Sequence, residues 1–316
     1  MVRSRSRVAV GLAVLGLSAA ALPAQPSNPG GASAATDRPG AAASRRISTA
    51  ALDALRGARD VVLLQVGPQA QFEAGHVAGA RPVALSDISA TRDETPLALE
   101  LPSAERLAQW ARSVGITAAS RIVVIPASDT LQSATRVLFT LDVMGFGDRV
   151  QLLDGGLPAW RRAGLPVETG PAPALTALAE APAVRIDSSR LATIDQVAAA
   201  TADPAIEVLD ARLAQFYRGI GGGYPRPGHI PSAKNIPLNT LTTDGGLKSR
   251  EELQALFTAA GVAPGATVIT YCHIGQQASL LWFVARELGY DVKLFDGSFQ
   301  QWSGSDRPVV APPPTR

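Results

Sequence analysis

Residues 267–290 read TVITYCHIGQQASLLWFVARELGY, and the order of features in this stretch decides the fold. An apolar, β-branched run ends at Cys272, a short loop follows, and a long apolar segment of helical character comes next. A continuous apolar run of this length is typical of a strand buried on both faces of a parallel sheet. The stretch therefore predicts an α/β fold with Cys272 at the carboxyl end of a strand, where ligand sites of such sheets collect.

The loop at residues 273–277 (HIGQQ) predicts a cradle for an anion. Gly275 lets the backbone bend without the strain of a Cβ atom, and the N–H groups at the start of the next helix carry partial positive charge. A thiolate held by such N–H groups is stabilised. We therefore predict that the pKa of Cys272 is lowered and that the thiolate is a nucleophile near neutral pH. The alternative is an ordinary buried thiol at a strand end.

Four features occur twice in the chain, in the same order. The two copies lie far apart in the sequence, which indicates a duplicated domain, because solenoid repeats are much shorter. The matched pairs are GHVAGARPVAL (75–85) with GHIPSAKNIPL (228–238), SAERLAQWARSVGI (103–116) with SREELQALFTAAGV (249–262), RIVVIP (121–126) with ATVITY (266–271), and LLDGGLPAWRRAGLPV (152–167) with LFDGSFQQWSGSDRPV (294–309).

Each copy alternates short apolar runs with helical segments, which predicts an α/β fold with mostly parallel sheets. Two helices should open with capping boxes, Thr193 with Gln196 and Ser249 with Glu252. The predicted buried strands are VVLLQV (61–66), RIVVIP (121–126), RVQLLD (149–154), IEVLDA (206–211), TVITYC (267–272) and DVKLFD (291–296). The predicted organisation is a first domain over 47–170, a Pro- and Ala-rich linker over 171–187 and a second domain over 188–310.

The chain begins with a pattern typical of a secretory signal peptide. Three arginines among the first seven residues precede an uncharged apolar run at 8–22, and small residues follow. The run is shorter than the ~20 residues that span a bilayer, so we expect no permanent membrane span. We predict a signal peptide over 1–24, a flexible leader over 25–46 and export to the periplasm or the extracellular space. Cleavage after Ala24 and cleavage after Ala34 both fit the pattern.

The composition excludes several other classes of protein. There are 29 basic and 27 acidic residues, so no positive surplus favours nucleic acid. Cys272 is the only cysteine, which excludes an internal disulfide and a Cys-pair zinc or iron–sulfur site. The only histidines are His76, His229 and His273, which argues against a His-rich metal site. We expect neither a metal nor an organic cofactor.

The stretches GHIPSAKNIP (228–237), YCHIGQQAS (271–279) and the DGS…W ending (296–302) resemble the rhodanese family of sulfurtransferases. Residues 47–310 together are similar to its tandem thiosulfate/3-mercaptopyruvate members. The resemblance implies two rhodanese-like domains, each a parallel five-stranded sheet flanked by helices, and transfer of sulfur as a persulfide on Cys272. It implies a substrate cradle made of His273, Ile274, Gly275, Gln276 and Gln277.

The resemblance leaves the preferred donor open between thiosulfate and 3-mercaptopyruvate. Thiosulfate-preferring members carry basic residues after the cysteine, where this chain has His273 and Ile274. Mercaptopyruvate-type members have a serine at the position of Ile274 and an Asp–His pair from the first domain. Here Gln65 stands in place of the aspartate, and His76 fits the histidine.

Three arginines precede the cradle in DARLAQFYRGIGGGYPRPGHIP (210–231) and are candidate ligands of an anionic donor. Arg226 resembles the arginine that binds the substrate carboxylate in mercaptopyruvate enzymes. Arg218 can replace a second family arginine, whose place is taken by Gln215. For Arg212 and the other two, the alternative is a solvated side chain or an ion pair with Asp210.

Other features of the repeat are interpreted as structural. The matched His76 and His229 should satisfy backbone groups in turns. Trp160 and Trp302 should lie in the core. Asp154 and Asp296 open DG turns, where Asp and Gly are favoured for local reasons.

The first domain is predicted to be catalytically silent, because aligning the two copies places Ala127 opposite Cys272. A cysteine phosphatase would need an arginine where Ala278 stands, so this class does not fit. The sequence therefore predicts a sulfurtransferase that takes sulfur from a small anionic donor and passes it to cyanide, a thiol or a carrier protein. Two alternatives remain open: an exported, non-turnover sulfur carrier, and a purely structural thiol in a dead tandem pair.

Overall fold

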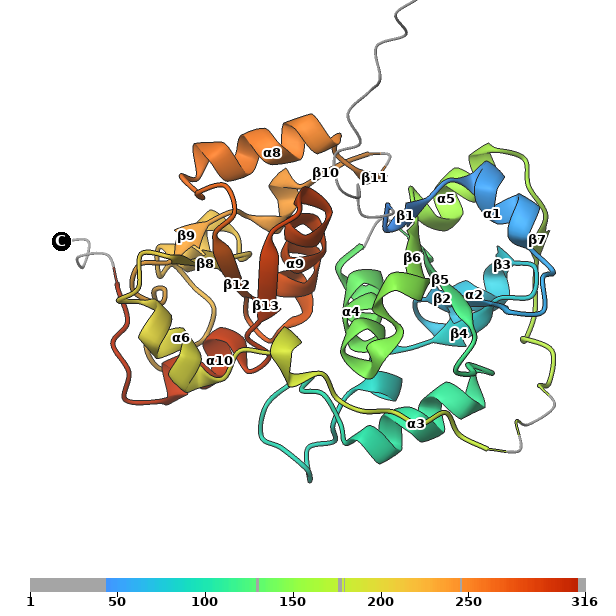
Figure 1. Cartoon of the computed structure of the whole chain (residues 1–316), viewed down its shortest axis with the longest axis horizontal. Helices are drawn as coiled ribbons and strands as arrows, with labels where there is room; N and C mark the ends of the chain where they lie inside the picture. Colours follow the sequence, from blue (N-terminus) through green and yellow to red (C-terminus); the bar gives the residue numbers. More distant parts are fainter. Residues whose placement is uncertain (1–43, 129–130, 176–177, 179, 245, 312–316) are drawn as a thin grey trace, which may run out of the picture. The chain divides into compact units, whose positions relative to one another are not determined.

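The structure is a computed structural model that describes residues 44–311, apart from 129–130, 176–177, 179 and 245 (Figure 1). The predicted signal peptide and nearly all of the predicted leader lie outside the described residues. All of the described residues belong to one compact unit. Within the part of the chain that is described, no helix is both long and apolar enough to cross a bilayer.

The first half is built on a five-stranded parallel sheet in the order β1-β6-β5-β2-β4. The central pair, β2 and β5, aligns Val61 with Arg121 and Val66 with Pro126. The strands of this sheet are β1 (Arg46–Ile47), β2 (Val61–Val66), β4 (Arg81–Val83), β5 (Arg121–Pro126) and β6 (Val150–Leu153). A short antiparallel ladder joins β3 (His76–Val77) to β7 (Val167–Glu168).

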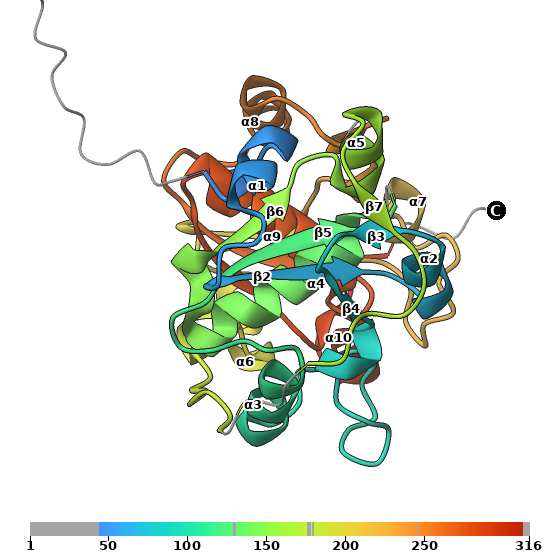
Figure 2. The ribbon, with the colours of Figure 1, turned by 90° about the vertical axis from the view of Figure 1, so that its right-hand side faces the viewer.

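Helices cover both faces of this sheet, as Figure 2 shows. Successive strand residues point to opposite faces: Leu63 packs with one apolar cluster and Leu64 with the other. The first face is covered by α1 (Thr49–Leu55), α2 (Gln69–Ala74) and α5 (Gly156–Arg162). The second face is covered by α3 (Ala104–Ser113) and α4 (Leu131–Leu141).

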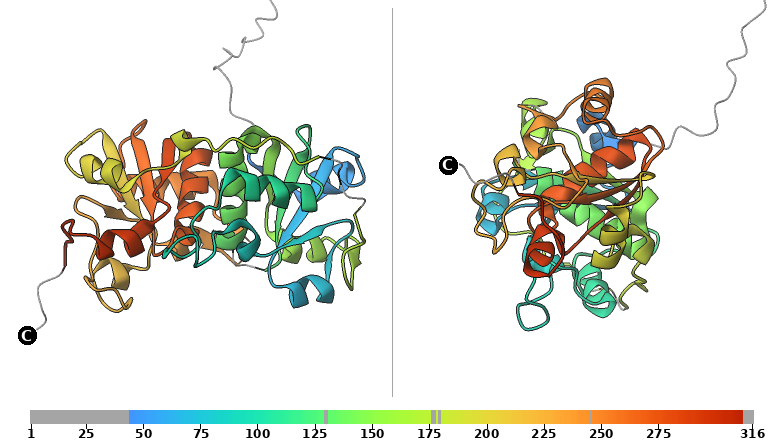
Figure 3. Two further views of the ribbon diagram at one scale, coloured as in Figure 1. Left: turned by 90° about the horizontal axis from the view of Figure 1, so that it is seen from below. Right: turned by 90° about the vertical axis from the view of Figure 1, so that its left-hand side faces the viewer.

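The second half repeats this plan with a four-stranded parallel sheet in the order β13-β12-β8-β9. Its strands are β8 (Ile206–Asp210), β9 (Lys234–Asn235), β12 (Thr267–Tyr271) and β13 (Asp291–Leu294). On one face lie α8 (Arg250–Ala259) and α9 (Gln276–Leu288), and on the other α6 (Ile194–Ala200), α7 (Ala214–Tyr217) and α10 (Ser298–Gly304) (Figure 3). A hairpin of β10 (Thr242–Thr243) and β11 (Gly246–Leu247) precedes α8.

The predicted α/β fold with two parallel sheets flanked by helices is confirmed, with one correction. The second sheet has four strands instead of five, and a single parallel bridge, Leu191 with Leu294, stands where the fifth strand would pair. The reason is local. A 3₁₀ turn at Ser188–Arg190 ends directly before Leu191, and Thr193 already caps α6.

Most predicted strand limits agree with the structure. Strands β2 and β5 coincide with the predicted runs, while the other four are one or two residues shorter. Both predicted capping boxes form: the Thr193 hydroxyl accepts from the Gln196 N–H and the Ser249 hydroxyl from the Glu252 N–H, each at 3.2 Å. Short turns complete the fold: 3₁₀ turns at Leu85–Ile88, Gly147–Arg149, Ser188–Arg190 and Leu238–Thr240 and a π-helical turn at Asp142–Phe146.

The last residues of the predicted leader already contact the rest of the described chain. Arg46 is already part of β1, which pairs with β6. The Arg45 N–H donates to Glu287 at 2.9 Å, and the Arg46 guanidinium pairs with the same carboxylate at 3.2 Å. The composition of the leader gave no sign of this pairing, since the acidic partner lies in the second half of the sequence.

The two halves meet along α4 and α9, which lie side by side in Figure 1. Phe139 and Trp282 pack edge to face with ring centroids 5.1 Å apart. The hydroxyls of Thr135 and Ser279 are hydrogen-bonded at 3.0 Å. Thr135 and Ser279 hold matching places in the repeat, so the helix pair is related by approximate two-fold symmetry, as expected after a duplication. The carboxyl end of β12 and the start of α9 therefore lie close to the first half.

Candidate active site

Cys272 follows β12 directly, as the sequence predicts, and its side chain is fully buried. Gly275 has a left-handed backbone (φ 85°) and caps the start of α9, which turns the chain sharply back over the strand end. Four backbone N–H groups, those of Ile274, Gly275, Gln277 and Ala278, face the sulfur of Cys272 and act to lower its pKa. The predicted cradle of inward-facing amides is therefore present.

The predicted lowering of the pKa is wrong in direction. Burial raises the pKa of the Cys272 thiol above its ordinary value, and this effect exceeds the opposing effect of the four N–H groups. The sequence shows that amides converge, but it does not show that the thiol loses all contact with water. The cradle thus favours a negative charge at the sulfur, while burial disfavours it.

Ser298 supports Cys272 from the opposite side. Its hydroxyl accepts a hydrogen bond from the Cys272 N–H at 3.2 Å and donates to the Phe295 carbonyl at 2.9 Å. Ser298 is fully buried and has a left-handed backbone with φ 49°. Its counterpart in the first half is Gly156, whose φ is 56°. A serine thus occupies a conformation that suits glycine, and its hydroxyl forms a hydrogen bond with the Cys272 N–H.

Aromatic side chains line the His273 side of the cradle. The Tyr224 hydroxyl is 2.8 Å from His273 Nδ1, and the ring of Phe216 meets the His273 ring edge to face at 4.8 Å. Burial, followed by the charge of Arg212, lowers the pKa of His273 to about 4, so the imidazole is neutral at physiological pH. From the sequence, His273 is the one residue directly after the cysteine that could become positive. In the structure its lowered pKa keeps the imidazole uncharged.

Tyr224 lies close enough to the cradle to sense its charges. Burial raises the pKa of Tyr224 to about 12, Arg212 lowers it, and negative charge at Cys272 and Asp210 raises it further. Tyr224 therefore stays protonated and offers a neutral hydroxyl beside His273 and the cysteine.

Arg212 is held in a buried ion pair instead of facing a donor. Its guanidinium contacts Asp210 at 2.6 Å and the Gly228 carbonyl at 2.7 Å, and it lies 4.0 Å from the centre of the Phe299 ring. The alternative interpretation of this arginine, an ion pair with Asp210, is the one observed. Arg212 contributes positive charge near His273 and Tyr224, but its Nε and Nη2 donors are already used.

Arg226 is also occupied. Its guanidinium donates to four backbone carbonyls at and beyond the end of α10, so it is not free to bind a carboxylate. The acceptors are the carbonyls of Trp302 (3.1 Å), Ser303 (3.1 Å), Ser305 and Arg307 (2.5 Å). Arg218, by contrast, is exposed, and its guanidinium makes no hydrogen bond or ion pair to any described residue. Of the three predicted arginines, only Arg218 keeps its donors available.

The glutamines of the cradle face the first half. Gln276 donates from Nε2 to the Ser133 hydroxyl at 2.9 Å, and Gln277 Oε1 is buried without a hydrogen-bond partner among the described residues. Arg136, from α4, also reaches this side of the cradle. A Cβ atom on Gly275 would lie only 2.9 Å from Arg136 Nη1, so the guanidinium packs directly against the loop.

The first-half residues proposed from the family pattern have structural contacts. Gln65 is buried and exchanges hydrogen bonds with the Gly75 carbonyl and the Val77 N–H. The rings of His76 and Phe72 stack at 3.8 Å, and His76 Nδ1 is 2.9 Å from the Phe72 carbonyl.

The second half repeats the contacts of His76, and the matched tryptophans also have the same contacts in both halves. His229 stacks on Tyr217 at the same 3.8 Å spacing and lies 2.8 Å from the Tyr217 carbonyl. Trp160 and Trp302 are fully buried, and each donates its indole N–H to a proline carbonyl at 2.9 Å. The structural interpretations of both histidines and both tryptophans are therefore confirmed.

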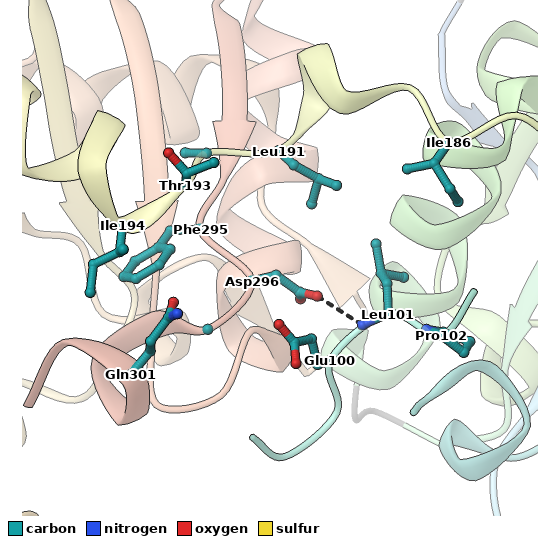
Figure 4. A pocket seen from close by; sticks show the side chains of 12 residues that line it. Glu100, Leu101, Pro102, Ile186, Leu191, Thr193, Ile194, Phe295, Asp296 and Gln301 are labelled. Carbon is teal, nitrogen blue, oxygen red and sulfur yellow. Dashed lines mark hydrogen bonds between the residues drawn. The ribbon is translucent and has the colours of Figure 1, made fainter. Parts of the chain in front are cut away.

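A cavity of about 390 Å³ lies beside the cradle, on the other side of the turn at Asp296 and Gly297 (Figure 4). Figure 4 shows the Asp296 carboxylate directed toward Leu101. It accepts a hydrogen bond from the Leu101 N–H at 2.9 Å. The walls are largely apolar, with Glu100 and Gln301 adding polar groups. None of the residues from Cys272 to Gln277 lines this cavity, so it is separate from the thiol.

Sequence reasoning missed four residues at the site: Phe216, Tyr224, Ser298 and Arg136. A signal existed for Tyr224, since an aromatic residue follows three glycines in the loop before Arg226. A signal also existed for Ser298, which replaces a glycine of the repeat. The contact of Arg136 depends on how the halves pack, and no local pattern reveals that. Asp296, interpreted as a local turn residue, in fact pairs with Arg136 at 2.5 Å.

Comparison with known proteins gives consistent matches in both halves. The model of the rhodanese-like domain matches residues 48–163 and again 193–305. Human 3-mercaptopyruvate sulfurtransferase is 35% identical over 249 residues, which cover 75% of this chain and 80% of the human protein. The 3-mercaptopyruvate sulfurtransferase of Escherichia coli K12 is 32% identical over 245 residues, which cover 74% of this chain and 83% of the relative.

Solved structures show the same architecture. The crystal structure of SseA from Escherichia coli, described as a 3-mercaptopyruvate sulfotransferase, aligns with a TM-score of 0.71 and 25% identity over 81% of this chain and 98% of SseA. An anaerobic ergothioneine biosynthesis enzyme from Chlorobium limicola aligns with a TM-score of 0.75. It is 19% identical and covers 85% of this chain and 71% of the enzyme, a likeness that concerns the fold alone.

Proposed function

Because the chain belongs to the rhodanese-like domain family in both halves, we propose that it transfers a sulfur atom from a small anionic donor to a nucleophilic acceptor through a persulfide on Cys272. One observation carries the proposal: four backbone N–H groups converge on the sulfur of the only cysteine. N–H groups placed in this way stabilise negative charge on sulfur in the thiolate and in the persulfide.

The reaction has two displacement steps. In the first, the Cys272 thiolate attacks the outer sulfur of thiosulfate. A sulfur–sulfur bond forms, the donor's own sulfur–sulfur bond breaks, and sulfite leaves with the bonding electrons. With 3-mercaptopyruvate the carbon–sulfur bond breaks instead, and the pyruvate carbanion that leaves takes up a proton. In the second step cyanide or a thiolate attacks the outer sulfur of the persulfide and regenerates the Cys272 thiolate.

The donor class follows from the charges that the site can offer. His273 is neutral, and the donors of Arg212 and Arg226 are used within the protein. The cradle amides and the exposed Arg218 are what remain to attract an anion. We therefore expect weak discrimination between thiosulfate and 3-mercaptopyruvate at the cradle itself, with Arg218 adding a long-range attraction.

Intact mass measurement tests the persulfide. Purified protein is weighed before and after incubation with thiosulfate, or with 3-mercaptopyruvate, and again after cyanide is added. We expect a gain of one sulfur atom that cyanide removes as thiocyanate, and no gain in Cys272→Ser. A sulfur adduct that persists in the serine variant, or its absence with both donors, would disprove the proposal.

The same preparation separates an enzyme from a carrier. An exported sulfur carrier would gain and lose one sulfur atom once, with no steady production of thiocyanate. An enzyme produces thiocyanate continuously, with parallel double-reciprocal plots typical of a ping-pong mechanism.

We also propose that the chain is exported through its N-terminal segment. Three early arginines followed by an uncharged apolar run support this. The test is the intact mass of protein recovered from the periplasmic fraction or the medium, where we expect loss of residues 1–24 or 1–34. Recovery of the full-length chain from the cytoplasm alone would contradict export.

A further inference from the structure

Arg136 is a buried charge of the first half placed against the cysteine loop of the second half. Its side chain is fully buried. Nη1 donates to Asp296 at 2.5 Å, and Nη2 donates to the Leu99 carbonyl at 2.5 Å. The absent Cβ of Gly275 would lie 2.9 Å from Nη1 and 3.0 Å from the Asp296 carbonyl oxygen. The guanidinium and the Asp296 turn therefore both lie in close contact with Gly275, the glycine that shapes the cradle.

One partner of Arg136 belongs to the turn that supports the cysteine. Asp296 and Gly297 lead directly into Ser298, whose hydroxyl accepts the Cys272 N–H. The second carboxylate oxygen of Asp296 accepts the Leu101 N–H at 2.9 Å, the contact drawn in Figure 4. A shift of Asp296 would therefore change both the position of Ser298 and the contact with Leu101 in the first half.

The other partner, Leu99, belongs to a first-half segment, Leu97–Leu101, that is held near the cradle by hydrogen bonds. Leu99 has a left-handed backbone with φ 57°, which is unfavourable for leucine and persists only where contacts impose it. The Ala98 N–H donates to the Gln300 side chain at 2.9 Å, and the Gln300 N–H donates to the His273 carbonyl at 3.0 Å. The segment is thus tied to the cysteine loop through Gln300 and through Arg136.

An arginine is not required here by packing alone. The repeat places Arg136 after Thr135 as it places Leu280 after Ser279, and Leu280 is a buried apolar residue. Burying a guanidinium costs free energy unless it is paired. The planar guanidinium donates to two partners at once in fixed directions, which neither leucine nor lysine can do.

Resting on the proposed sulfur transfer, we propose that Arg136 is a positioning residue for that reaction. It clamps the Leu97–Leu101 segment of the first half and the Asp296 turn of the second half onto the Cys272 cradle. The clamp holds the cradle amides in place and controls access to the buried thiol. The first half thereby takes part in the chemistry, although Ala127 stands where its own nucleophile would be.

Arg136→Met and Arg136→Lys test the clamp with three measurements: thiosulfate:cyanide turnover, the rate of Cys272 alkylation by iodoacetamide, and the melting temperature. We expect Arg136→Met to lower kcat/KM by about tenfold or more, mostly through kcat. In the same variant, alkylation should become severalfold faster because the thiol is uncovered. Arg136→Lys keeps one charged contact and should lie between methionine and wild type.

The control is Arg121→Met, which removes an exposed pair with Asp60 whose atoms are 2.8 Å apart. It should leave both rates unchanged. If Arg136→Met lowers only the melting temperature, while turnover and alkylation per folded molecule stay at wild-type values, the positioning role is overturned.

A second variant covers the case in which Arg136→Met does not fold. Arg136→Met combined with Asp296→Asn removes both charges together, so no unpaired buried charge remains. Faster alkylation in this double variant supports the clamp, and an unchanged rate overturns it. Alkylation does not depend on sulfur transfer. A wild-type protein without turnover would therefore refute the proposed function while the alkylation comparison still decides the clamp.

Discussion

Ser298 shows how one residue accepts backbone strain to serve its neighbour. Its counterpart Gly156 adopts a similar left-handed conformation, and a Cβ there would lie 2.6 Å from the Pro126 carbonyl oxygen. At position 298 a side chain fits, and its hydroxyl satisfies the buried N–H of Cys272. A left-handed non-glycine residue costs on the order of 1 kcal/mol, which the hydrogen bond offsets.

Ser298→Ala should destabilise the protein by about 1–3 kcal/mol, because it leaves the Cys272 N–H buried without an acceptor. It should also slow sulfur transfer, since the amide next to the sulfur loses its orientation. Ser298→Gly should recover about 1 kcal/mol of that loss by relieving the strain, but not the transfer rate. Urea unfolding and thiocyanate production measure the two effects. An alanine variant equal to wild type in both would refute this role.

The pH dependence of Cys272 reactivity follows from the two shifted groups in the loop. Burial raises the pKa of Cys272, and the pKa of His273 is lowered to about 4, so neither group changes charge near neutrality. The rate of alkylation should therefore rise steadily with pH between about pH 6 and about pH 9, because it follows the small thiolate fraction. A rate that levels off below about pH 7.5 would show a lowered pKa and contradict the burial effect.

At the scale of elements, Arg226 secures the end of α10. A helix leaves its last carbonyls without internal partners, and a cation there is favourable. Arg226 donates to four carbonyls at and after this end, whereas Arg218 on the same loop is exposed. The two arginines offer a matched comparison between a structural and a substrate-facing role.

Arg226→Met should lower the melting temperature by several degrees, since it leaves several carbonyls without donors. The KM for the donor should change little in this variant. Arg218→Met should leave the melting temperature unchanged and raise the KM for thiosulfate by about two- to fivefold, an effect that weakens as salt is added. The reverse assignment, with KM raised by Arg226→Met and unaffected by Arg218→Met, would restore the interpretation drawn from the sequence.

The sequence predicts well what is local. Strands β2 and β5, both capping boxes and the cradle around Gly275 follow from apolar runs, side-chain pairs and one glycine. The family and the enzyme class, a sulfurtransferase, are confirmed because the motifs stand in a fixed order in both halves.

What the sequence could not predict depends on burial and on distant partners. The pKa of Cys272 depends on whether water reaches the sulfur. The donors of Arg226 are used by carbonyls at and after the end of α10. The Asp296–Arg136 pair joins residues 160 positions apart. None of these contacts has a periodic or local signature.

At the scale of the whole described unit, the duplication has produced two halves with unequal duties. Helices α4 and α9 form an approximately symmetric pair, with Thr135 against Ser279. Around that pair the symmetry is broken in two ways. The second half keeps the cysteine, and the first half supplies Arg136. Loss of the nucleophile from the first half therefore does not make this half dispensable for the site.

Asp142 joins three distant parts of the chain, and its removal should weaken the whole unit. The carboxylate is buried and faces Arg45 at 3.1 Å, Arg190 at 3.3 Å and Arg286 at 3.8 Å. Asp142→Ala would leave three partly buried cations without their shared anion. We expect a loss of stability on the order of 3 kcal/mol, measured by urea unfolding.

The matched control is Asp148→Ala, which removes a fully exposed carboxylate 3.6 Å from Arg45. Exposed pairs of this kind contribute about 0–1 kcal/mol, so this variant should unfold as the wild type does. If Asp142→Ala were as mild as Asp148→Ala, the arginines would be neutralised by solvent and counterions instead. The N-terminal segment, the start of the second half and α9 would then be joined by apolar packing and by the contacts of Arg45 and Arg46 with Glu287. A loss confined to Asp142→Ala would instead show that one buried carboxylate, shared by arginines from distant parts of the chain, contributes to the stability of the whole unit.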